Sequence, residues 1–282
     1  MLKLLRSNLA RMIKSKIFWI IIAAYALYSI LLPLSQEPYL PYEEGEYSAE
    51  ELLALNYGVA GFPVQGLLIA ILSCVILGAD FHNSTIRNKL AVGHTRSQLY
   101  IANLLTSATI SMALNVVYFL FFFTIIFPLR GGFNGFATAQ EIILLLVDGT
   151  LMMLSYSAII TLIITASKNP TAAIIVSIIL LMSFMLITIP CAGTLDEVPY
   201  IVGTKFDEET GEIVDKIFYN LSYPSKAERD FCHFILDCFP TGQSFQLANE
   251  FNIRWQMPLY SLGMIVATSG AGILIFERSN IK

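Results

Sequence analysis

Few residues in this chain could carry out chemistry, and their spacing excludes most reactions. None of His82, His94 and His233 has a second His or a Cys at metal-ligand spacing on its own side. The chain has no phosphate-binding glycine loop, no HExxH, no GxSxG and no GxGxxG motif. We therefore predict a non-catalytic chain that binds no metal or cofactor of its own and does not hydrolyse ATP.

Polar and basic residues gather instead in one segment, residues 80–100, which separates two long apolar runs. A helix of about two turns is expected from Thr85 to Val92, because Ile86 and Leu90 share a face at a spacing of four. Gly93 would then end this helix. The pattern predicts a short, rigid helix parallel to a membrane surface and joined tightly to two spans.

Charged and polar residues surround this predicted helix. Asp80 precedes it, and pairing with Arg87 or Arg96 would hold the end of the preceding apolar run. Asn83 or Ser84 could cap its first turn. The candidate site comprises Asp80, Thr85, Ile86, Arg87, Asn88, Lys89, Leu90, Gly93 and Arg96.

The composition places these residues in an all-α integral membrane protein. Hydrophobic residues make up 56% of the chain and charged residues 13%, with a mean hydropathy of +0.67. The apolar runs are continuous and do not alternate with a period of two, so they predict helices and not barrel strands. Six spans are predicted, at 17–34, 59–79, 101–129, 142–166, 171–190 and 257–276. The third is too long for one upright crossing, so tilt, a break or a protruding end is expected.

Charge predicts the orientation of these spans. If both termini face the same side as the 80–100 loop, that side holds only two acids, Asp80 and Glu277. Its bases are Lys3, Arg6, Arg11, Lys14, Lys16, Arg87, Lys89, Arg96, Lys168, Arg278 and Lys282. Acids outnumber bases in the loops of the other side. The positive-inside rule then places both termini and the 80–100 loop in the cytoplasm.

Residues 1–16 are expected to form an amphipathic helix in the inner headgroup layer, because apolar and basic side chains alternate at helical spacing. The apolar positions are Leu2, Leu5, Leu9, Met12 and Ile13. An ordinary basic flank of the first span fits almost equally well. A signal peptide cleaved after Ala26 is a third interpretation, which would leave five spans.

The 80–100 segment resembles the membrane subunits of ABC transporters of the ABC-2 type, which carry a pattern like G-x-E-F-x-x-G-T-I-R-N-K-L-x-x-G-x-S-R-x-x-I-Y between spans two and three. The matching residues are Gly78, Phe81, Thr85, Ile86, Arg87, Asn88, Lys89, Leu90, Gly93, Arg96 and Tyr100. Asp80, Ser84 and Thr95 stand for the usual Glu, Gly and Ser. The segment FPTGQSFQLAN, residues 239–249, is similar to the stretch before the last span in the same family.

This resemblance covers the whole chain, residues 1–282, as one permease domain. It implies an exporter subunit in the cell membrane of a bacterium, with residues 80–100 as a coupling loop. That loop docks into a separate ATPase, which carries the ATP and Mg, while a second permease, identical or paralogous, completes the transporter. No nucleic-acid partner is implied, and the resemblance names no transported substrate.

Polar residues within the spans are the next candidates. Asp148 lies near the middle of the fourth span, where an unpaired carboxylate is costly, and Asn115 in the third span is a candidate hydrogen-bond partner. Asp148 could mark the translocation path or the permease dimer seam. Alternatively, it is protonated or shallowly placed and satisfied by neighbouring helices. Gly263, Ala267 and Ala271 recur every fourth residue on the last span, which favours close helix packing.

The loops of the outer side are larger than connectors require, above all the extracellular loop 191–256. Ser48 and Ser225 each open a predicted capping box and a short helix. Residues 201–206 and 212–218 are predicted to form a β-hairpin around a glycine turn. The acidic residues of these loops are expected to be solvated. Cysteines 191, 232 and 238 also lie in the outer loop, where one oxidised pair could form.

Two other functions fit the same pattern. One is a self-contained ion-coupled carrier, although no inverted repeat is visible. The other keeps the exporter architecture and uses it for immunity, extracting bacteriocin-like toxic peptides from the membrane. A neighbouring gene for an ATPase with a phosphate loop would separate the exporter from the carrier.

Overall fold

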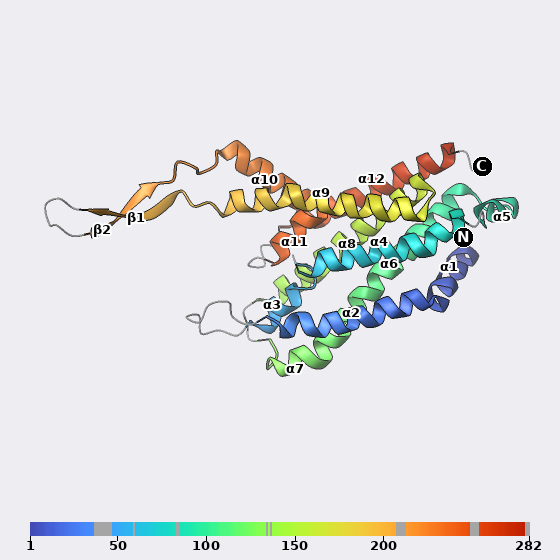
Figure 1. Ribbon diagram of the computed structural model, residues 1–282, viewed down its shortest axis with the longest axis horizontal. Helices are drawn as coiled ribbons and strands as arrows, with labels where there is room; N and C mark the ends of the chain where they lie inside the picture. The colour runs from blue at the N-terminus through green and yellow to red at the C-terminus, as the bar shows by residue number, and fades with distance from the viewer. Residues whose placement is uncertain are drawn as a thin grey trace.

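Six long apolar helices run side by side in the computed structural model (Figure 1), which describes residues 1–36, 47–58, 60–82, 85–133, 135, 137–206, 213–248 and 254–279. Within these residues they are the helices long and apolar enough to cross a membrane. Their bounds are α2 (Lys16–Leu34), α4 (Gly61–His82), α6 (Arg96–Phe121), α8 (Ala139–Ser167), α9 (Pro170–Asp196) and α12 (Met257–Arg278). The predicted class, a mostly helical multi-pass membrane protein, is therefore confirmed.

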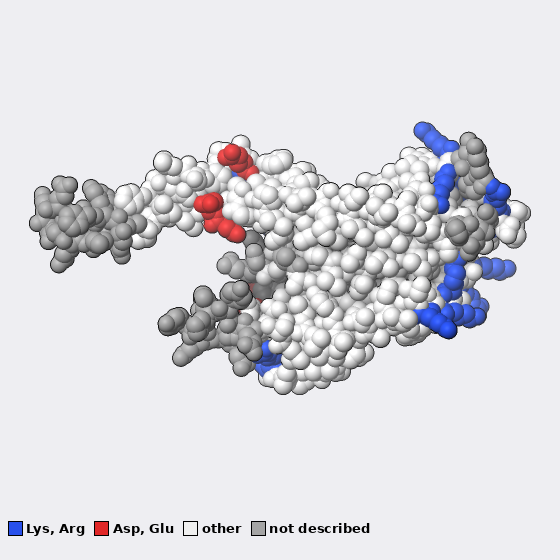
Figure 2. All heavy atoms as spheres, in the orientation of Figure 1, with Lys and Arg blue, Asp and Glu red and all other residues white. Residues whose placement is uncertain are grey.

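The two ends of the bundle differ in charge. Both termini lie at one end, together with α1 (Leu2–Lys14) and α5 (Thr85–Ala91), and most of the Lys and Arg visible in Figure 2 gather there. We call this the basic end. The opposite, hairpin end carries α3 (Ala49–Ala54), α10 (Lys226–Cys238), α11 (Pro240–Ala248) and the strands β1 (Tyr200–Phe206) and β2 (Ile213–Tyr219).

The helices form a centre and a periphery. In the most apolar window of α4, 61% of the residues are buried, and 56% in α8, but only 17% in α12 and 22% in α2 and α9. The peripheral helices therefore expose apolar faces to their surroundings, which water would penalise at about 25 cal/mol per Å² of apolar surface. Hydrocarbon removes that penalty, so the burial pattern fits a bundle surrounded by lipid.

Two predicted spans differ from the observed helices. The third apolar run begins earlier, at Arg96, and a π-helical segment, η1 (Phe122–Ile126), interrupts it before α7 (Phe127–Leu129). This is a break of the kind that its length predicts. The fifth helix is longer than the predicted span, because α9 continues through Pro190 to Asp196. A proline removes one N–H donor, and the last turns of α9 gain packing against α10.

The first loop of the hairpin end folds back into the bundle. The predicted capping box is present, since Ser48 accepts the N–H of Glu51 while the Glu51 carboxylate accepts the N–H of Ser48. Glu50 is fully buried and accepts the N–H of Gly135 at 3.0 Å. The expectation that the acids of this loop are solvated is therefore wrong for Glu50, because α3 packs against the bundle with Leu52 and Leu53 at its core.

The second loop of the hairpin end contains the predicted hairpin. Strands β1 and β2 pair antiparallel, from Tyr200 opposite Tyr219 to Phe206 opposite Ile213. The glycine turn predicted between them lies outside the described residues. The predicted capping box of Ser225 and Glu228 opens α10.

Helix α11 contains most of the FPTGQSFQLAN segment and closes the bundle beside α9 and α8. Its core is polar as well as buried. The Gln243 amide donates to the backbone oxygens of Asp237 and Met257 and accepts from the hydroxyl of Ser261. These bonds tie α10, α11 and α12 together, so the segment forms a compact cap over the hairpin end.

Candidate functional site

The short helix predicted in the loop between the second and third spans is present as α5, Thr85–Ala91. Gly93 has a φ of +94°, and its N–H bonds to the carbonyl of Leu90, so glycine ends the helix as expected. Thr95 then caps α6 through a capping box with Gln98. The proposed caps at Asn83 and Ser84 lie outside the described residues. Local sequence signals thus fix where α5 ends and where α6 begins.

The carboxylate of Asp80, 1% exposed, is the centre of the basic end. It accepts hydrogen bonds from the Arg11 guanidinium at 2.5 and 2.9 Å, from Lys89 Nζ at 2.6 Å and from Thr85 Oγ1 at 2.8 Å. Arg11 belongs to α1, Asp80 to α4, and Thr85 and Lys89 to α5. One carboxylate therefore holds three helices together.

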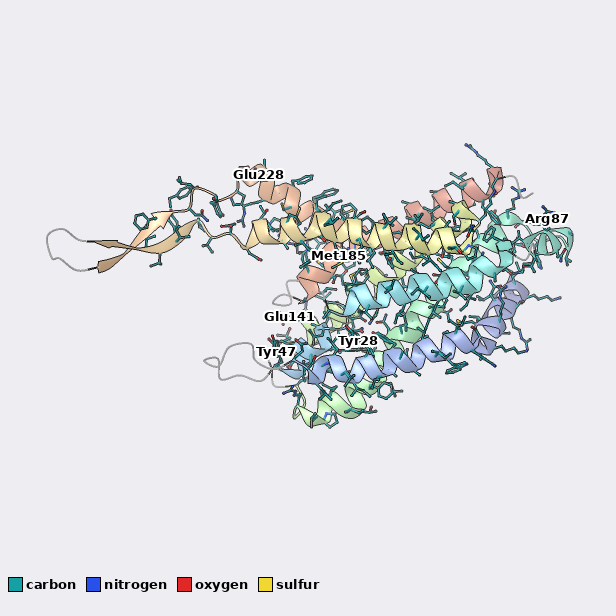
Figure 3. The ribbon with its side chains drawn as sticks, in the orientation of Figure 1. Tyr28, Tyr47, Arg87, Glu141, Met185 and Glu228 are labelled. Carbon is teal, nitrogen blue, oxygen red and sulfur yellow. The ribbon has the colours of Figure 1, made fainter. Side chains whose placement is uncertain are left out.

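This arrangement corrects the predicted pairing of Asp80 with Arg87 or Arg96. Arg87 projects away from the bundle at its basic end (Figure 3) and is exposed. Arg96 points toward the last helix, where it donates to the carbonyl oxygens of Phe276 at 3.0 Å and Glu277 at 2.8 Å. A cation suits the negative end of the α12 dipole, so Arg96 fastens α6 to α12.

A second polar contact strengthens the link to α1. Asn8 Nδ2 donates to Asn103 Oδ1 on α6 at 3.1 Å, and both side chains are buried. Asn8 Oδ1 accepts from Arg11 and from Lys89, at 3.2 and 3.3 Å. We call the cluster of Asp80, Arg11, Thr85 and Lys89 the Asp80 node. The hydrogen bonds of Asn8 extend this node to a fourth helix, α6.

Apolar packing lies beneath these polar contacts. Ile86 of α5 is 3% exposed and belongs to a cluster with Leu4 of α1, Leu99 and Tyr100 of α6, and Phe276 of α12. Leu90 packs against the same cluster. The predicted shared face of Ile86 and Leu90 therefore points into the protein. Displacing α5 alone would open this cluster, at a cost of about 0.8 kcal/mol per CH₂ exposed.

The opposite edge of α5 is free of such contacts in the described structure. Arg87, Asn88 and Ala91 are exposed, and Val92, one residue beyond the helix, is 80% exposed. The helix therefore has one face fixed to the bundle and one edge that a soluble partner could reach.

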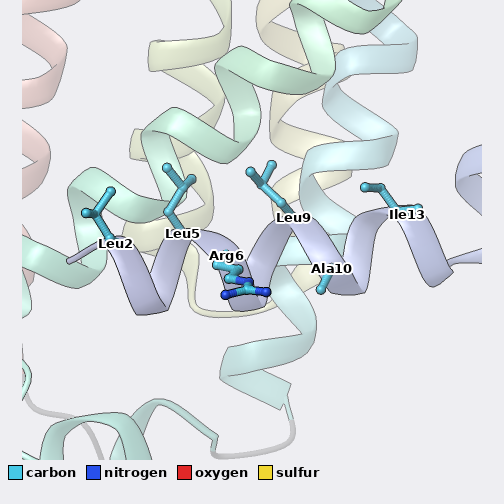
Figure 4. A pocket seen from close by; sticks show the side chains of 6 residues that line it. All are labelled: Leu2, Leu5, Arg6, Leu9, Ala10 and Ile13. Carbon is cyan, nitrogen blue, oxygen red and sulfur yellow. The ribbon is translucent and has the colours of Figure 1, made fainter.

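The orientation of α1 differs from the expected one. Its buried residues are Leu4, Asn8 and Met12, whereas Leu2 and Ile13 are 81% and 54% exposed. Leu2, Leu5, Leu9 and Ile13 line one side of the helix, along a shallow apolar groove (Figure 4). Met12 was assigned to this apolar face and belongs to the protein-facing one. Asn8 and Arg11 are site residues that were not predicted from the sequence, although the spacing of four from Leu4 through Asn8 to Met12 marks a second face.

The polar residues predicted at membrane depth are not joined to each other. Asp148 is fully buried, and neither carboxylate oxygen has a hydrogen-bond partner among the described residues. Asn115 Oδ1 accepts from Asn56 Nδ2 at 3.0 Å, while Asn115 Nδ2 is also without a partner there. The expected bond between Asn115 and Asp148 is therefore absent. Asn56 is bound by Gln65, which also bonds to Tyr25, so Asn115 is held in a network that excludes Asp148.

The small residues of α12 are also placed differently. Gly263, Ala267 and Ala271 lie on an exposed face, and nothing within 4 Å would meet a Cβ at Gly263. Gly272 makes the close approach instead, because a Cβ there would lie 2.2 Å from the hydroxyl oxygen of Tyr100. The predicted packing stripe therefore makes no close helix contact at Gly263 within this chain, and packing of its exposed face against a second copy stays a prediction.

Among the described residues, no three His, Cys, Asp or Glu side chains come together in a way that could hold a metal ion. Within the described residues, the basic end is joined by the ion pairs of Asp80 with Arg11 and Lys89 and by the hydrogen bond from the Thr85 hydroxyl. Comparison with known proteins adds no assignment: no family model matches the chain, and no curated protein matches it.

Proposed function

We propose that this chain is the membrane-spanning permease subunit of an ATP-binding cassette exporter, with its basic end in the cytoplasm and α5 docked into a separate ATPase. The observation that supports this proposal most is that one face of α5 is packed against the bundle while one edge is exposed. The resemblance of residues 78–100 to the ABC-2 pattern gives the class of partner, and the charge distribution gives the orientation.

The proposed mechanism uses α5 as a rigid lever. A push on the exposed edge at Arg87 reaches α4 through the bonds of Lys89 and Thr85 to Asp80. It reaches α1 through Arg11 of the same node. Because Ile86 is packed against α6 and α12, these helices would have to tilt with α5. ATP hydrolysis on the partner would supply the work, and a second permease copy or paralogue would form the other half of the pathway.

The docking step is tested by changing only the exposed edge. We expect the double variant Arg87→Glu and Val92→Asp to abolish copurification of the ATPase from membranes solubilised in mild detergent. Both residues belong to the exposed edge that is proposed to dock the ATPase, and neither is part of the core. The readouts are the amount of a copurified subunit that carries a phosphate-binding loop and the ATP hydrolysis of the eluate. Arg278→Glu is the matched control, since Arg278 is an exposed cation at the same end but on α12.

Unchanged copurification and hydrolysis in the double variant would contradict docking through α5. An eluate of the wild-type chain without ATP hydrolysis would contradict the exporter assignment itself. Orientation is tested separately with Val92→Cys in a chain whose four native cysteines are replaced by serine; the new cysteine should react with a membrane-impermeant maleimide in inverted vesicles and not in intact cells. Labelling from the outside would refute the proposed topology.

One observation favours the alternative of an ion-coupled carrier. Asp148 is buried and has no hydrogen-bond partner among the described residues, and such carboxylates bind a proton or a cation in carriers. In the carrier hypothesis, vesicles containing the purified chain alone would transport in response to an ion gradient, and Asp148→Asn would abolish this. In the exporter hypothesis, the chain alone transports nothing.

A further inference from the structure

Two of the three cysteines at the hairpin end lie together. Cys191, near the end of α9, and Cys232, in the middle of α10, are 8% and 7% exposed. They share an apolar cluster with Ile235 and Leu236 of α10, and their thiol groups contact one another.

The third cysteine is excluded as a partner by geometry. Cys238 is on the same helix as Cys232 and six residues away, which separates their Cα atoms by about 9 Å, beyond the roughly 7 Å that a disulfide spans. Cys238 is also outside the cluster that contains Cys191, and it lines a different, apolar groove between α9 and α12 together with Tyr260. Cys191 and Cys232 are therefore the pair that the fold brings together.

We infer that Cys191 and Cys232 form a disulfide that staples α10 to the end of α9. The two thiols would lose two protons and two electrons as the S–S bond forms. The electrons would pass to the disulfide of a thiol oxidase on the outer side of the membrane, which becomes a dithiol. Disulfides persist in such oxidising compartments. The inference rests on the proposed orientation, which puts the hairpin end outside, but it is independent of any ATPase partner.

The bond would act on the cap over the hairpin end. Helix α10 passes into α11 through a turn so tight that a Cβ on Gly242 would lie 2.5 Å from the Cα of Leu236. Helix α11 is also bonded to α9, because Thr188 Oγ1 of α9 donates to Thr241 Oγ1 at 3.2 Å. A covalent link at Cys232 would thus hold the whole α10–α11 cap on α9. It would also close the chain between residues 191 and 232, which restricts the unfolded state.

The test is peptide mapping of the full chain from membranes solubilised in denaturant with excess N-ethylmaleimide. We expect one peptide pair joining Cys191 to Cys232, two hydrogen masses below the sum of the free peptides, with Cys74 and Cys238 alkylated. Cys238→Ser should retain the linked pair, and Cys232→Ser should lose it. A reducing agent should lower the thermal midpoint of the wild type by several degrees and leave that of Cys232→Ser unchanged.

Alkylation of both Cys191 and Cys232 in the wild type, even after incubation of the membranes with oxidised glutathione, would overturn the inference. A link through Cys238 would overturn it as well. The Val92→Cys labelling distinguishes failure of the disulfide from failure of the proposed orientation. If the cysteines are reduced and residue 92 is labelled from the cytoplasmic side, only the disulfide is refuted. Reduced cysteines with labelling from the outside refute the orientation too.

Discussion

Replacement of Asp80 by Asn should loosen the basic end without removing the surface that a partner would bind. The carboxylate accepts four hydrogen bonds, two from Arg11 and one each from Lys89 and Thr85. An amide keeps one acceptor oxygen and turns an NH₂ group toward the cations. Arg11 and Lys89 would lose their counter-ion while their side chains are 36% and 18% exposed.

The magnitude follows from this partial exposure. Removing one partner of a fully buried ion pair costs about 3–5 kcal/mol, and a hydrogen bond to a charged group contributes about 1.5–3 kcal/mol. Because water can still reach both cations, we expect Asp80→Asn to lower the free energy of unfolding by about 2 kcal/mol. With the partner present, ATP turnover should fall while copurification through the edge at Arg87 persists.

A double-mutant cycle with Lys89→Met, measured by denaturation in mild detergent, isolates the pair. We expect a coupling energy of about 1–2 kcal/mol between Asp80 and Lys89, since the residues are in direct contact. Glu277→Gln is the control, because Glu277 is an exposed acid at the same end, and it should change stability by less than about 0.5 kcal/mol. Additive single effects, within about 0.3 kcal/mol, would refute the argument that Asp80 joins α4 to α5.

Three further predictions concern other parts of the fold. Gly272→Ala should lower the thermal midpoint, because overpacking against Tyr100 costs about 1–3 kcal/mol, whereas Gly270→Ala in open space on the same helix should not lower it. Asp148→Asn should leave the free energy of unfolding unchanged or raise it, since no hydrogen bond among the described residues is lost; a loss above about 1 kcal/mol would reveal a partner. The pKa of Glu228 lies below its ordinary value of 4.5 because Ser225 donates to the carboxylate from its hydroxyl and its N–H. Its contribution to stability is therefore present above pH 4.5 and lost as the pH falls through the lower folded-state pKa, which faster hydrogen exchange in the first turn of α10 would report.

The features that the sequence predicted correctly are those that depend on neighbouring residues. Long apolar runs predict spans, because the hydrocarbon thickness fixes a length of about 20 residues for any helix that crosses it. The capping boxes opened by Ser48 and Ser225 join residues three positions apart, so local chemistry is enough to place them. The helical stop at Gly93 follows from the same kind of local requirement.

The features that were wrong depend on which face of a helix turns inward. Asp80 is paired with Arg11, which lies 69 residues away, and Asn8 with Asn103, 95 residues away. Nothing in the local pattern distinguishes these partners from Arg87, because every cation near the basic end is compatible with the same charge rule. The stripe that includes Gly263 is likewise exposed within the chain, because a pattern of small residues does not show which neighbour its helix face will meet.

The main role of the Asp80 node is to fix the positions of α1 and α5, more than to stabilise the fold. Helix α5 has seven residues, too few to be stable alone, and α1 lies across the bundle with one face uncovered. Apolar contacts alone would let either helix slide, because similar hydrophobic packing exists in several registers. A buried carboxylate between Arg11 and Lys89 removes that freedom, since any shift leaves an ion without its partner. The proposed push on α5 would then move α1, α4 and α6 together, because a shift of α5 alone would break the ion pair of Asp80 with Lys89.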